Sequence, residues 1–144
     1  MLRKTLFVLC ALLGTTFGSH AYGDEPRTHE QTVRQFVTAF NERDTEAMMA
    51  LVTEDLQWLS IDGEKVAEET GDKDQLRAAM LSYFESCSSC RSRFIHVFST
   101  GSRVAALEEA SFDTQSGRRQ QRSLSVYEFS GHLIRRVYYF PVEL

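Results

Sequence analysis

The pattern of hydrophobic and polar residues divides the chain into a mainly helical first half and a second half of strands. Hydrophobic residues recur at helical spacing in three segments, which begin after Thr28, Asp44 and Asp72. Each of these residues is a favourable helix N-cap, because its side-chain oxygen can accept a hydrogen bond from a backbone N–H of the first turn. From Arg93 onward the period changes to two, which is typical of strands.

Four strands are predicted in the second half and one in the first. The segment 56–61 has strand character, whereas the polar segment 64–71 is predicted as a loop. Strands joined by short turns pair antiparallel, and such turns separate the later predicted strands, 93–99, 103–113, 121–130 and 133–140. We therefore expect an α+β domain with three N-terminal helices on one face of a curved antiparallel sheet.

Residues 1–23 have the organisation of a cleavable secretory signal peptide: cations, a hydrophobic segment and small residues that permit cleavage after Ala21 or Gly23. The hydrophobic segment, residues 5–17, is shorter than the about 20 residues that a membrane span requires. The alternatives are an uncleaved anchor and a buried helix. We expect an exported protein, periplasmic or secreted, with a single mature domain of residues 24–144.

Removal of the signal peptide makes the chain more acidic, because it takes away two cations and no acid. The net charge changes from −4 for the whole chain to −6 for residues 24–144. Nucleic acids and anionic membranes attract cations, so we expect neither as a partner of the mature protein. The cluster Arg118, Arg119 and Arg122 follows a turn signal and is predicted as a solvated hairpin tip.

Cys87 and Cys90 form a C-x-x-C pair at the end of the third helical segment. Cleavage removes Cys10, and in an oxidising compartment a disulfide is the natural state of the remaining pair. Free thiols and thiol redox catalysis are the alternatives. Redox catalysis requires the first cysteine at a helix N-terminus, where the dipole lowers the thiol pKa, whereas this pair follows a helix. No spacing of His, Cys, Asp and Glu indicates a metal site, and no cofactor is expected.

Two segments resemble the nuclear transport factor 2-like superfamily, which includes SnoaL-like polyketide cyclases and ketosteroid isomerases. They are VRQFVTAFNERDTEAMMALVTEDLQWLSIDG, residues 33–63, and SVYEFSGHLIRRVYYF, residues 125–140. The resemblance extends over residues 29–140. It implies a cone-shaped α+β domain whose helices pack on the concave face of the sheet and enclose a pocket, often in a homodimer.

The catalytic residues of the enzymes in this superfamily are absent from the matching positions. Phe36, Ser60 and Ser125 stand where ketosteroid isomerases have a tyrosine donor, an aspartate base and a protonated aspartate. Pro141 replaces the carboxylate that often ends the last strand of SnoaL-like cyclases. The leading hypothesis is therefore a non-catalytic or uncharacterised exported domain that binds a small, partly apolar molecule.

The second hypothesis is a cofactor-free lyase, isomerase or hydrolase. Glu108 or His96 would act as the base, and Tyr127 as a hydrogen-bond donor. The structural alternatives are a cross-strand Glu108–Arg136 ion pair, a hydrogen-bonded His96 and a packing role for Tyr127. The resemblance suggests pocket-lining positions, although Trp58 also suits the core; they are Phe36, Trp58, Tyr83, Ser125, Arg136, Tyr138 and Phe140.

The third hypothesis is an interaction module, because the other face of the predicted sheet is more apolar than a soluble monomer usually exposes. We expect a homodimer through this face. Its apolar positions are Ile95, Val97, Leu107, Leu124, Val126, Leu133, Val137 and Tyr139.

Overall fold

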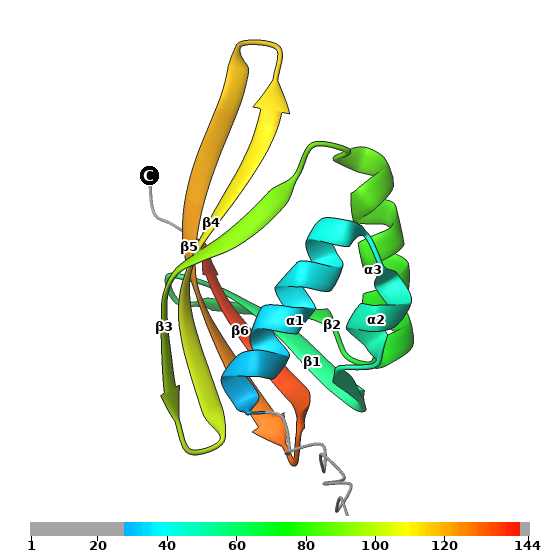
Figure 1. Cartoon of the computed structure of the whole chain (residues 1–144), viewed down its shortest axis with the longest axis vertical. Coiled ribbons are helices and arrows are strands. Elements are labelled where there is room, and N and C mark those ends of the chain that lie inside the picture. Colours follow the sequence, from blue (N-terminus) through cyan, green and yellow to red (C-terminus); the bar gives the residue numbers. More distant parts are fainter. Residues whose placement is uncertain (1–27, 142–144) are drawn as a thin grey trace, which may run out of the picture.

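Three helices pack against one curved sheet, which confirms the predicted α+β class (Figure 1). The computed structural model describes residues 28–141, and the predicted signal peptide lies outside this range. No helix within the described range is both long and apolar enough to cross a membrane. The elements are α1 (His29–Glu42), α2 (Thr45–Met49), β1 (Val52–Asp62), β2 (Lys65–Thr70), α3 (Lys73–Ser86), β3 (Arg91–Thr100), β4 (Arg103–Thr114), β5 (Gly117–Ser130) and β6 (Leu133–Pro141).

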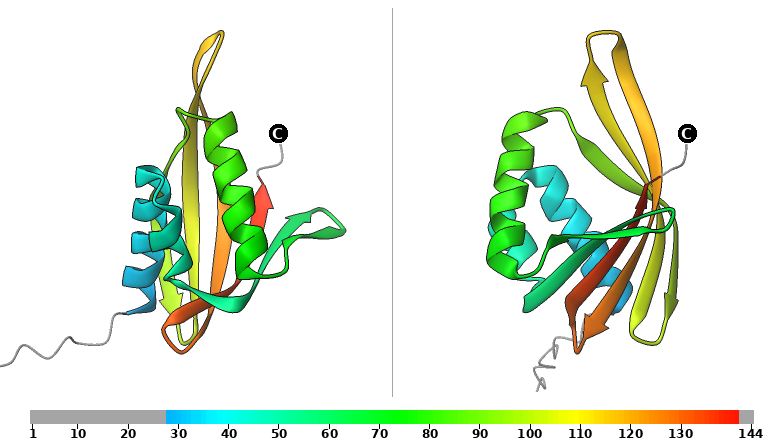
Figure 2. Two further views of the ribbon diagram at one scale, coloured as in Figure 1. Left: turned by 90° about the vertical axis from the view of Figure 1, so that its right-hand side faces the viewer. Right: turned by 180° about the vertical axis from the view of Figure 1, so that it is seen from behind.

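The six strands form one sheet in the order β2-β1-β6-β5-β4-β3. All neighbouring strands pair antiparallel except β1 and β6, which are parallel, so the sheet is mixed. A parallel pair needs a long connection, and here the chain between β1 and β6 passes through α3 and the other strands. The helices cover the concave face, and the β4–β5 hairpin extends beyond them (Figure 2).

Each helix begins at the N-cap that the sequence predicts. The side chains of Thr28, Asp44 and Asp72 each accept a hydrogen bond from the backbone N–H three residues later. At the end of α1, Arg43 adopts a left-handed conformation with φ of 62°. Its guanidinium group donates to the carbonyl oxygen of Phe84 at 3.0 Å, which ties the end of α1 to the end of α3.

The start of α1 is held against two hairpin turns by His29. The two ring nitrogens lie 3.0 Å from the carbonyl oxygen of Gly101 and 2.9 Å from that of Gly131. The ring also stacks on Phe129 with a centroid distance of 4.2 Å. The helix is therefore fixed over the sheet at the end where the β3–β4 and β5–β6 turns meet.

The hydrophobic core lies between the helices and the concave face of the sheet. It contains the predicted hydrophobic stripe of α1 and inward-facing residues of β1, β4, β5 and β6. Its buried members are Val33, Phe36, Ala39, Met48, Met49, Leu51, Val52, Leu56, Leu76, Val104, Ala106, Tyr127, Phe129, Ile134 and Val137.

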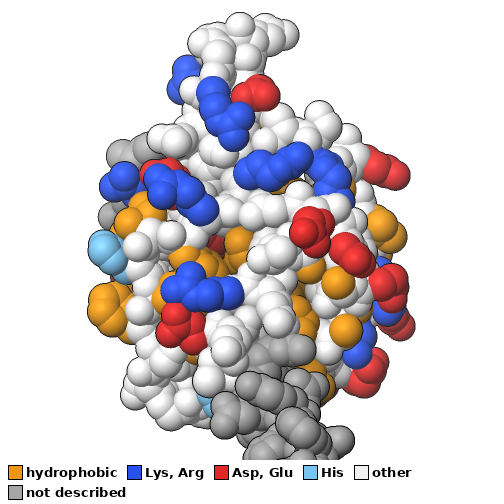
Figure 3. Space-filling model, viewed as in Figure 1, with side chains coloured by type: hydrophobic (Ala, Val, Ile, Leu, Met, Phe, Trp, Pro, Cys, Tyr) orange, Lys and Arg blue, Asp and Glu red, His pale blue; other side chains and the backbone are white. Residues whose placement is uncertain are grey.

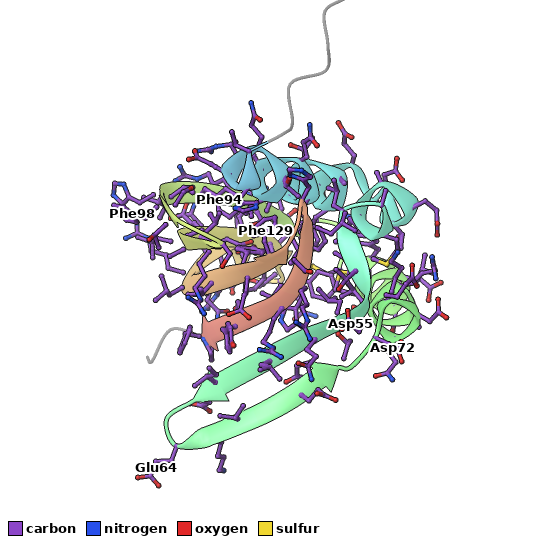
Figure 4. The ribbon with its side chains drawn as sticks, turned by 90° about the horizontal axis from the view of Figure 1, so that it is seen from below. Asp55, Glu64, Asp72, Phe94, Phe98 and Phe129 are labelled. Atoms are coloured by element: carbon purple, nitrogen blue, oxygen red, sulfur yellow. A yellow bond between two sulfur atoms is a disulfide. The ribbon has the colours of Figure 1, made fainter. Side chains whose placement is uncertain are left out.

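A β-bulge in β3 reverses which side chains face the helices. Phe94 and His96 pair with consecutive residues of β4, so Ile95 is an extra residue between them. Beyond the bulge His96 and Phe98 lie on the convex face, whereas plain alternation predicts them on the same face as Phe94. Figure 4 shows Phe94 beneath α1 and Phe98 at the outer margin, where its side chain is 68% exposed.

A second bulge has the same effect in β6. Ile134 and Arg136 pair with consecutive residues of β5, so Arg135 is the extra residue. Ile134 faces the helices before the bulge, and Val137 and Tyr139 face them after it. The alternate residues Arg136, Tyr138 and Phe140 therefore lie on the convex face.

Strand β2 lies in the segment 64–71, for which the sequence predicts a loop. It pairs antiparallel with β1 at the edge of the sheet, in a hairpin that projects from the body with Glu64 at its tip (Figure 4). Five of its six residues are exposed, and only Thr70 is buried. Because neither face of this strand is covered, no alternation of hydrophobic and polar residues marks it in the sequence.

Candidate functional site

A cavity of about 300 Å³ lies between the helices and the sheet. This volume is at the lower end of the range for small-molecule sites in proteins. Its wall is aromatic and sulfur-containing, with no charged side chain; the residues are Phe36, Phe40, Met48, Trp58, Met80, Tyr83 and Tyr139.

Helical spacing brings most of this wall together. Phe36 and Phe40 are one turn apart on α1, and Met80 and Tyr83 are one turn apart on α3, so each pair projects to one side of its helix. The rings of Phe40 and Tyr83 meet between the two helices with a centroid distance of 5.8 Å. On the sheet side, Trp58 lies 6.4 Å from Phe36 by the same measure.

Glu108 is an acidic residue on the same inner face of the sheet as the cavity residue Tyr139. It lies on the inner face of β4, where the hydroxyl groups of Ser92 and Ser125 donate to its carboxyl oxygens, the latter at 3.4 Å. Ser125 pairs with the cavity residue Tyr139 across β5 and β6. Burial raises the pKa of the Glu108 carboxyl, and the two hydroxyl donors oppose this effect.

The tyrosine hydroxyls of the wall and the Glu108 carboxyl interact electrostatically. Burial raises the pKa of Tyr83, and the charges of Tyr139 and Glu108 raise it further. Ser125, the cross-strand neighbour of Tyr139, donates to Glu108 at 3.4 Å, so polar groups lie on the sheet side of the cavity. The site is thus an apolar chamber with a polar end.

Of the three residues predicted for catalysis, Glu108 and Tyr127 lie near one another and His96 lies apart. His96 is exposed on the convex face because of the bulge in β3. Tyr127 is only 2% exposed and packs edge-on against Phe94, which leaves it in the core, and burial raises its pKa well above the ordinary value. Tyr127 forms a hydrogen bond with Ser125, which also donates to Glu108, so these two predicted residues share one neighbour.

The predicted pocket residues divide in a similar way. Phe36, Trp58 and Tyr83 line the cavity, and Ser125 lies behind it as the partner of Glu108. The remaining three, Arg136, Tyr138 and Phe140, lie on the convex face, which corrects the sequence prediction. The physical reason is the extra residue in β6, which sequence periodicity cannot reveal.

Arg136 has partners on the convex face and makes no ion pair with Glu108. Its guanidinium group donates to Gln57 Oε1 at 2.6 and 2.9 Å and lies 3.5 Å from Glu128. A hydrogen bond from Arg136 to the Tyr138 hydroxyl raises the pKa of Arg136. The predicted Glu108–Arg136 ion pair is therefore wrong.

Four wall residues were missed by the sequence prediction: Phe40, Met48, Met80 and Tyr139. Phe40 follows Phe36 by four residues and Met80 precedes Tyr83 by three, so helical spacing could have found these two. Tyr139 could not be found, because its orientation depends on the bulge.

Cys87 and Cys90 form a disulfide in the loop between α3 and β3, which confirms the predicted pairing. The carbonyl oxygen of Cys87 accepts a hydrogen bond of 3.3 Å from Arg43. The loop is thereby joined to the end of α1, next to the helix that carries Met80 and Tyr83. Among residues 28–141, no group of three or more His, Cys, Asp and Glu side chains could hold a metal ion.

Cross-strand charges mark the convex face. The Glu109 side chain is 5% exposed and lies between Arg93 and Arg122, at 2.5 and 3.2 Å. The hydrogen bond from Arg93 is the main cause of the lowered pKa of Glu109. A similar group consists of Glu128 with Arg103 and Arg136.

Apolar side chains occupy the convex face between these two charged groups. Leu124 is 45% exposed, and its neighbours across the strands are Leu107 and Phe140. The next rung joins Val126 to Tyr138. This apolar band consists of Leu107, Leu124, Val126, Tyr138 and Phe140. The first three were predicted for this face, whereas the predicted Val97, Val137 and Tyr139 face inward.

Comparison with known proteins places the chain among small α+β domains. The family model described as SnoaL-like domain matches residues 33–137. No curated protein matches the chain. A similar solved structure is an NTF2-like protein of unknown function from Burkholderia pseudomallei, with 18% identity over 79% of this chain and 90% of that chain and a TM-score of 0.67.

Two further structures are similar at lower identity. One is TerC co-crystallised with polyporic acid, with 11% identity over 79% of this chain and 91% of that chain and a TM-score of 0.66. The other is AclR, a putative hydroxylase from Streptomyces galilaeus, with 10% identity over 79% of this chain and 88% of that chain and a TM-score of 0.65. At these identities the likeness shows the fold alone.

Proposed function

Because the chain belongs to the SnoaL-like domain family, we propose that the cavity between its helices and sheet binds a small, partly apolar molecule. The observation that carries the proposal is the aromatic wall, in which rings from α1, α3, β1 and β6 surround about 300 Å³. An apolar chamber with a few polar groups is the common form of a small-molecule site. TerC, which shares the fold, was co-crystallised with polyporic acid, and this supports an organic molecule as the ligand without indicating its charge.

A ligand screen with matched variants tests this function. Thermal-shift measurements and native mass spectrometry on the purified protein would identify molecules that raise Tm and add mass. Met80→Trp fills the cavity and should abolish the effect of a true ligand. Leu81→Trp is the matched control, because Leu81 is 51% exposed on the same helix and should leave binding unchanged. Hits that bind Met80→Trp as well as the wild type, or a broad library without hits, would contradict the proposal.

A second candidate function is cofactor-free acid–base catalysis by Glu108. The observation in its favour is a largely buried carboxyl on the inner face of the sheet, which accepts from two serine hydroxyls and whose pKa is raised by burial, as is common for catalytic acids and bases. Incubating each ligand with the protein and analysing the mixture by mass spectrometry would detect turnover. Catalysis predicts that Glu108→Gln stops turnover without loss of binding, and an unchanged ligand after prolonged incubation would exclude it.

We also propose that the protein is exported and that residues 1–23 are removed, as the N-terminal pattern indicates. Expression of the full chain with N-terminal sequencing of the product tests this. A mature N-terminus at Tyr22 or Asp24 is expected, and a full-length product in the cytoplasm would contradict export.

A homodimer through the convex face is the third part of the proposal. The apolar band is flanked on both sides by arginine–glutamate groups, so a second copy can bury the band while its charged groups meet their counterparts. The mass in solution tests this association.

A further inference from the structure

The cavity joins an aromatic wall to a carboxyl group that has no cationic partner. Five of the seven wall residues are aromatic, and the other two are methionines. Ring faces carry partial negative charge and attract cations, and this attraction strengthens where water is excluded. The chemistry of the wall alone therefore admits both neutral and cationic molecules, and the neighbouring charge decides between them.

Glu108 lies at the polar end of this wall. On the inner face of the sheet, Ser125 of β5 is the cross-strand partner of Tyr139. Two residues before Ser125, on the same face of β5, Ser123 is the cross-strand partner of Glu108. Its carboxyl oxygens accept from Ser125 and Ser92. Ser125 therefore stands between the Glu108 carboxyl and the wall residue Tyr139, so a molecule in the cavity lies one residue away from this carboxyl.

The charge of Glu108 is not balanced by protein groups in the described range. Of the two consecutive glutamates on β4, only Glu109 forms ion pairs, with Arg93 and Arg122 on the convex face. A carboxylate that is largely buried with only hydroxyl donors is costly to ionise. A ligand that carries a positive charge would remove this cost, whereas a neutral ligand would not.

The surface charges near the cavity are mixed, and only the net charge favours a cation. In Figure 3 acidic side chains gather at the right, over the helices, but Lys and Arg side chains lie among them and beside the central hydrophobic patch. The net charge of −4 raises the local concentration of cations slightly.

We propose that the cavity selects a small organic cation, an amine or quaternary ammonium group on an apolar body, held by the aromatic wall and the Glu108 carboxylate. This inference rests on the proposed ligand-binding function and names the class of ligand. The cavity volume corresponds to about ten water-sized groups, at about 30 Å³ for each. The ligand is therefore an aryl or alkyl ammonium of about that many non-hydrogen atoms.

Three probes of matched size test the proposal by calorimetry with the full mature protein. 2-Phenylethylamine and benzyltrimethylammonium are cations, and 2-phenylethanol is the neutral analogue of the first. At about pH 8 both cations should bind at least about tenfold more tightly than the alcohol. Glu108→Gln should weaken the cations about tenfold and change the alcohol by less than about twofold. The matched control Glu85→Gln makes the same charge change at an exposed site of α3 and should leave all three affinities unchanged.

The affinity of benzyltrimethylammonium should also fall as the pH is lowered from about 8 to about 4. This probe does not titrate, so the loss reports protonation of protein groups, and it can be measured even if Glu108→Gln does not fold. Where Glu108→Gln does fold, its affinity should change much less with pH than that of the wild type and of Glu85→Gln. An affinity independent of pH would overturn the role of Glu108. Equal or tighter binding of the alcohol would overturn the choice of a cation while leaving the cavity as a binding site. If none of the probes binds, the inference fails, and the library screen judges the proposed function separately.

Discussion

The side-chain amide of Asn41 binds both backbone groups of Ser92. Asn41 Nδ2 donates to the Ser92 carbonyl oxygen at 2.8 Å, and the Ser92 N–H donates to Asn41 Oδ1 at 2.8 Å. Because β3 is an edge strand, these groups have no neighbouring strand, and Asn41 takes its place. Ser92 also donates its hydroxyl to Glu108, so α1 fixes the strand that positions this carboxyl.

Replacing Asn41 should therefore destabilise the fold. Asn41→Ala leaves a backbone donor and an acceptor of the buried Ser92 without partners, and we expect a loss of about 2–4 kcal/mol. Urea denaturation measures the change. Gln35→Ala on the exposed side of α1 is the control and should change the free energy of unfolding by less than about 0.5 kcal/mol. Equal effects of the two substitutions would show that the amide has no such role.

Glu108 should make stability depend on pH. Its pKa is raised by burial, so the folded protein holds this proton more tightly than the unfolded chain, and stability falls as the pH rises above the ordinary glutamate value. The side chain of Glu108→Gln does not titrate, so this variant should have a higher Tm than the wild type at about pH 8. At about pH 3, where the carboxyl is almost fully protonated in both states, this gain should disappear.

Circular dichroism melts at the two pH values measure this effect. Glu85→Gln, at an exposed position on α3, should show no such dependence. A difference between Glu108→Gln and wild type that is the same at both pH values would rule out titration of Glu108 as its cause.

The Cys87–Cys90 disulfide should contribute modestly to stability. It joins residues only three apart, and in the chain-entropy description so short a loop gives about 2 kcal/mol. Replacing both cysteines by serine should lower the free energy of unfolding by about this amount. A reducing agent should lower wild type to the same value and leave the double variant unchanged, and an effect of reduction on both proteins would point to another cause.

The proposed dimer should depend on the apolar band of the convex face. Light scattering at micromolar concentration should give twice the mass of the chain. Leu124→Asp places a charge in the centre of the band and should give a monomer. Leu81→Asp is the control, because Leu81 is similarly exposed but lies on the helical side. A monomeric wild type would refute the dimer.

Local chemistry made much of the fold predictable. The helix starts at Thr28, Asp44 and Asp72 depend on side chains that bind backbone groups three residues away, so the sequence contains the whole interaction. The disulfide between Cys87 and Cys90 is equally local. The inward faces of β4 and β5 followed from simple alternation, because these two strands pair without a register shift.

Long-range pairing explains what the sequence did not reveal. The extra residues Ile95 and Arg135 are defined only by the partner strands, and each reverses the side-chain pattern beyond it. Plain alternation therefore predicts the wrong face for His96 and for Arg136, Tyr138 and Phe140. The pairing of Arg93 and Arg122 with Glu109 depends on the register of three strands, which a single sequence does not specify.

The bulge at Arg135 lets β6 hold one residue more than its partner strand without turning the wall of the cavity around. Deletion of Arg135 would remove the bulge and leave Val137 and Tyr139 facing the helices, because the remaining residues already alternate. A relative that is one residue shorter at this point can therefore keep the same wall. Positions of the wall correspond between two such proteins only when an alignment places its gap at Arg135.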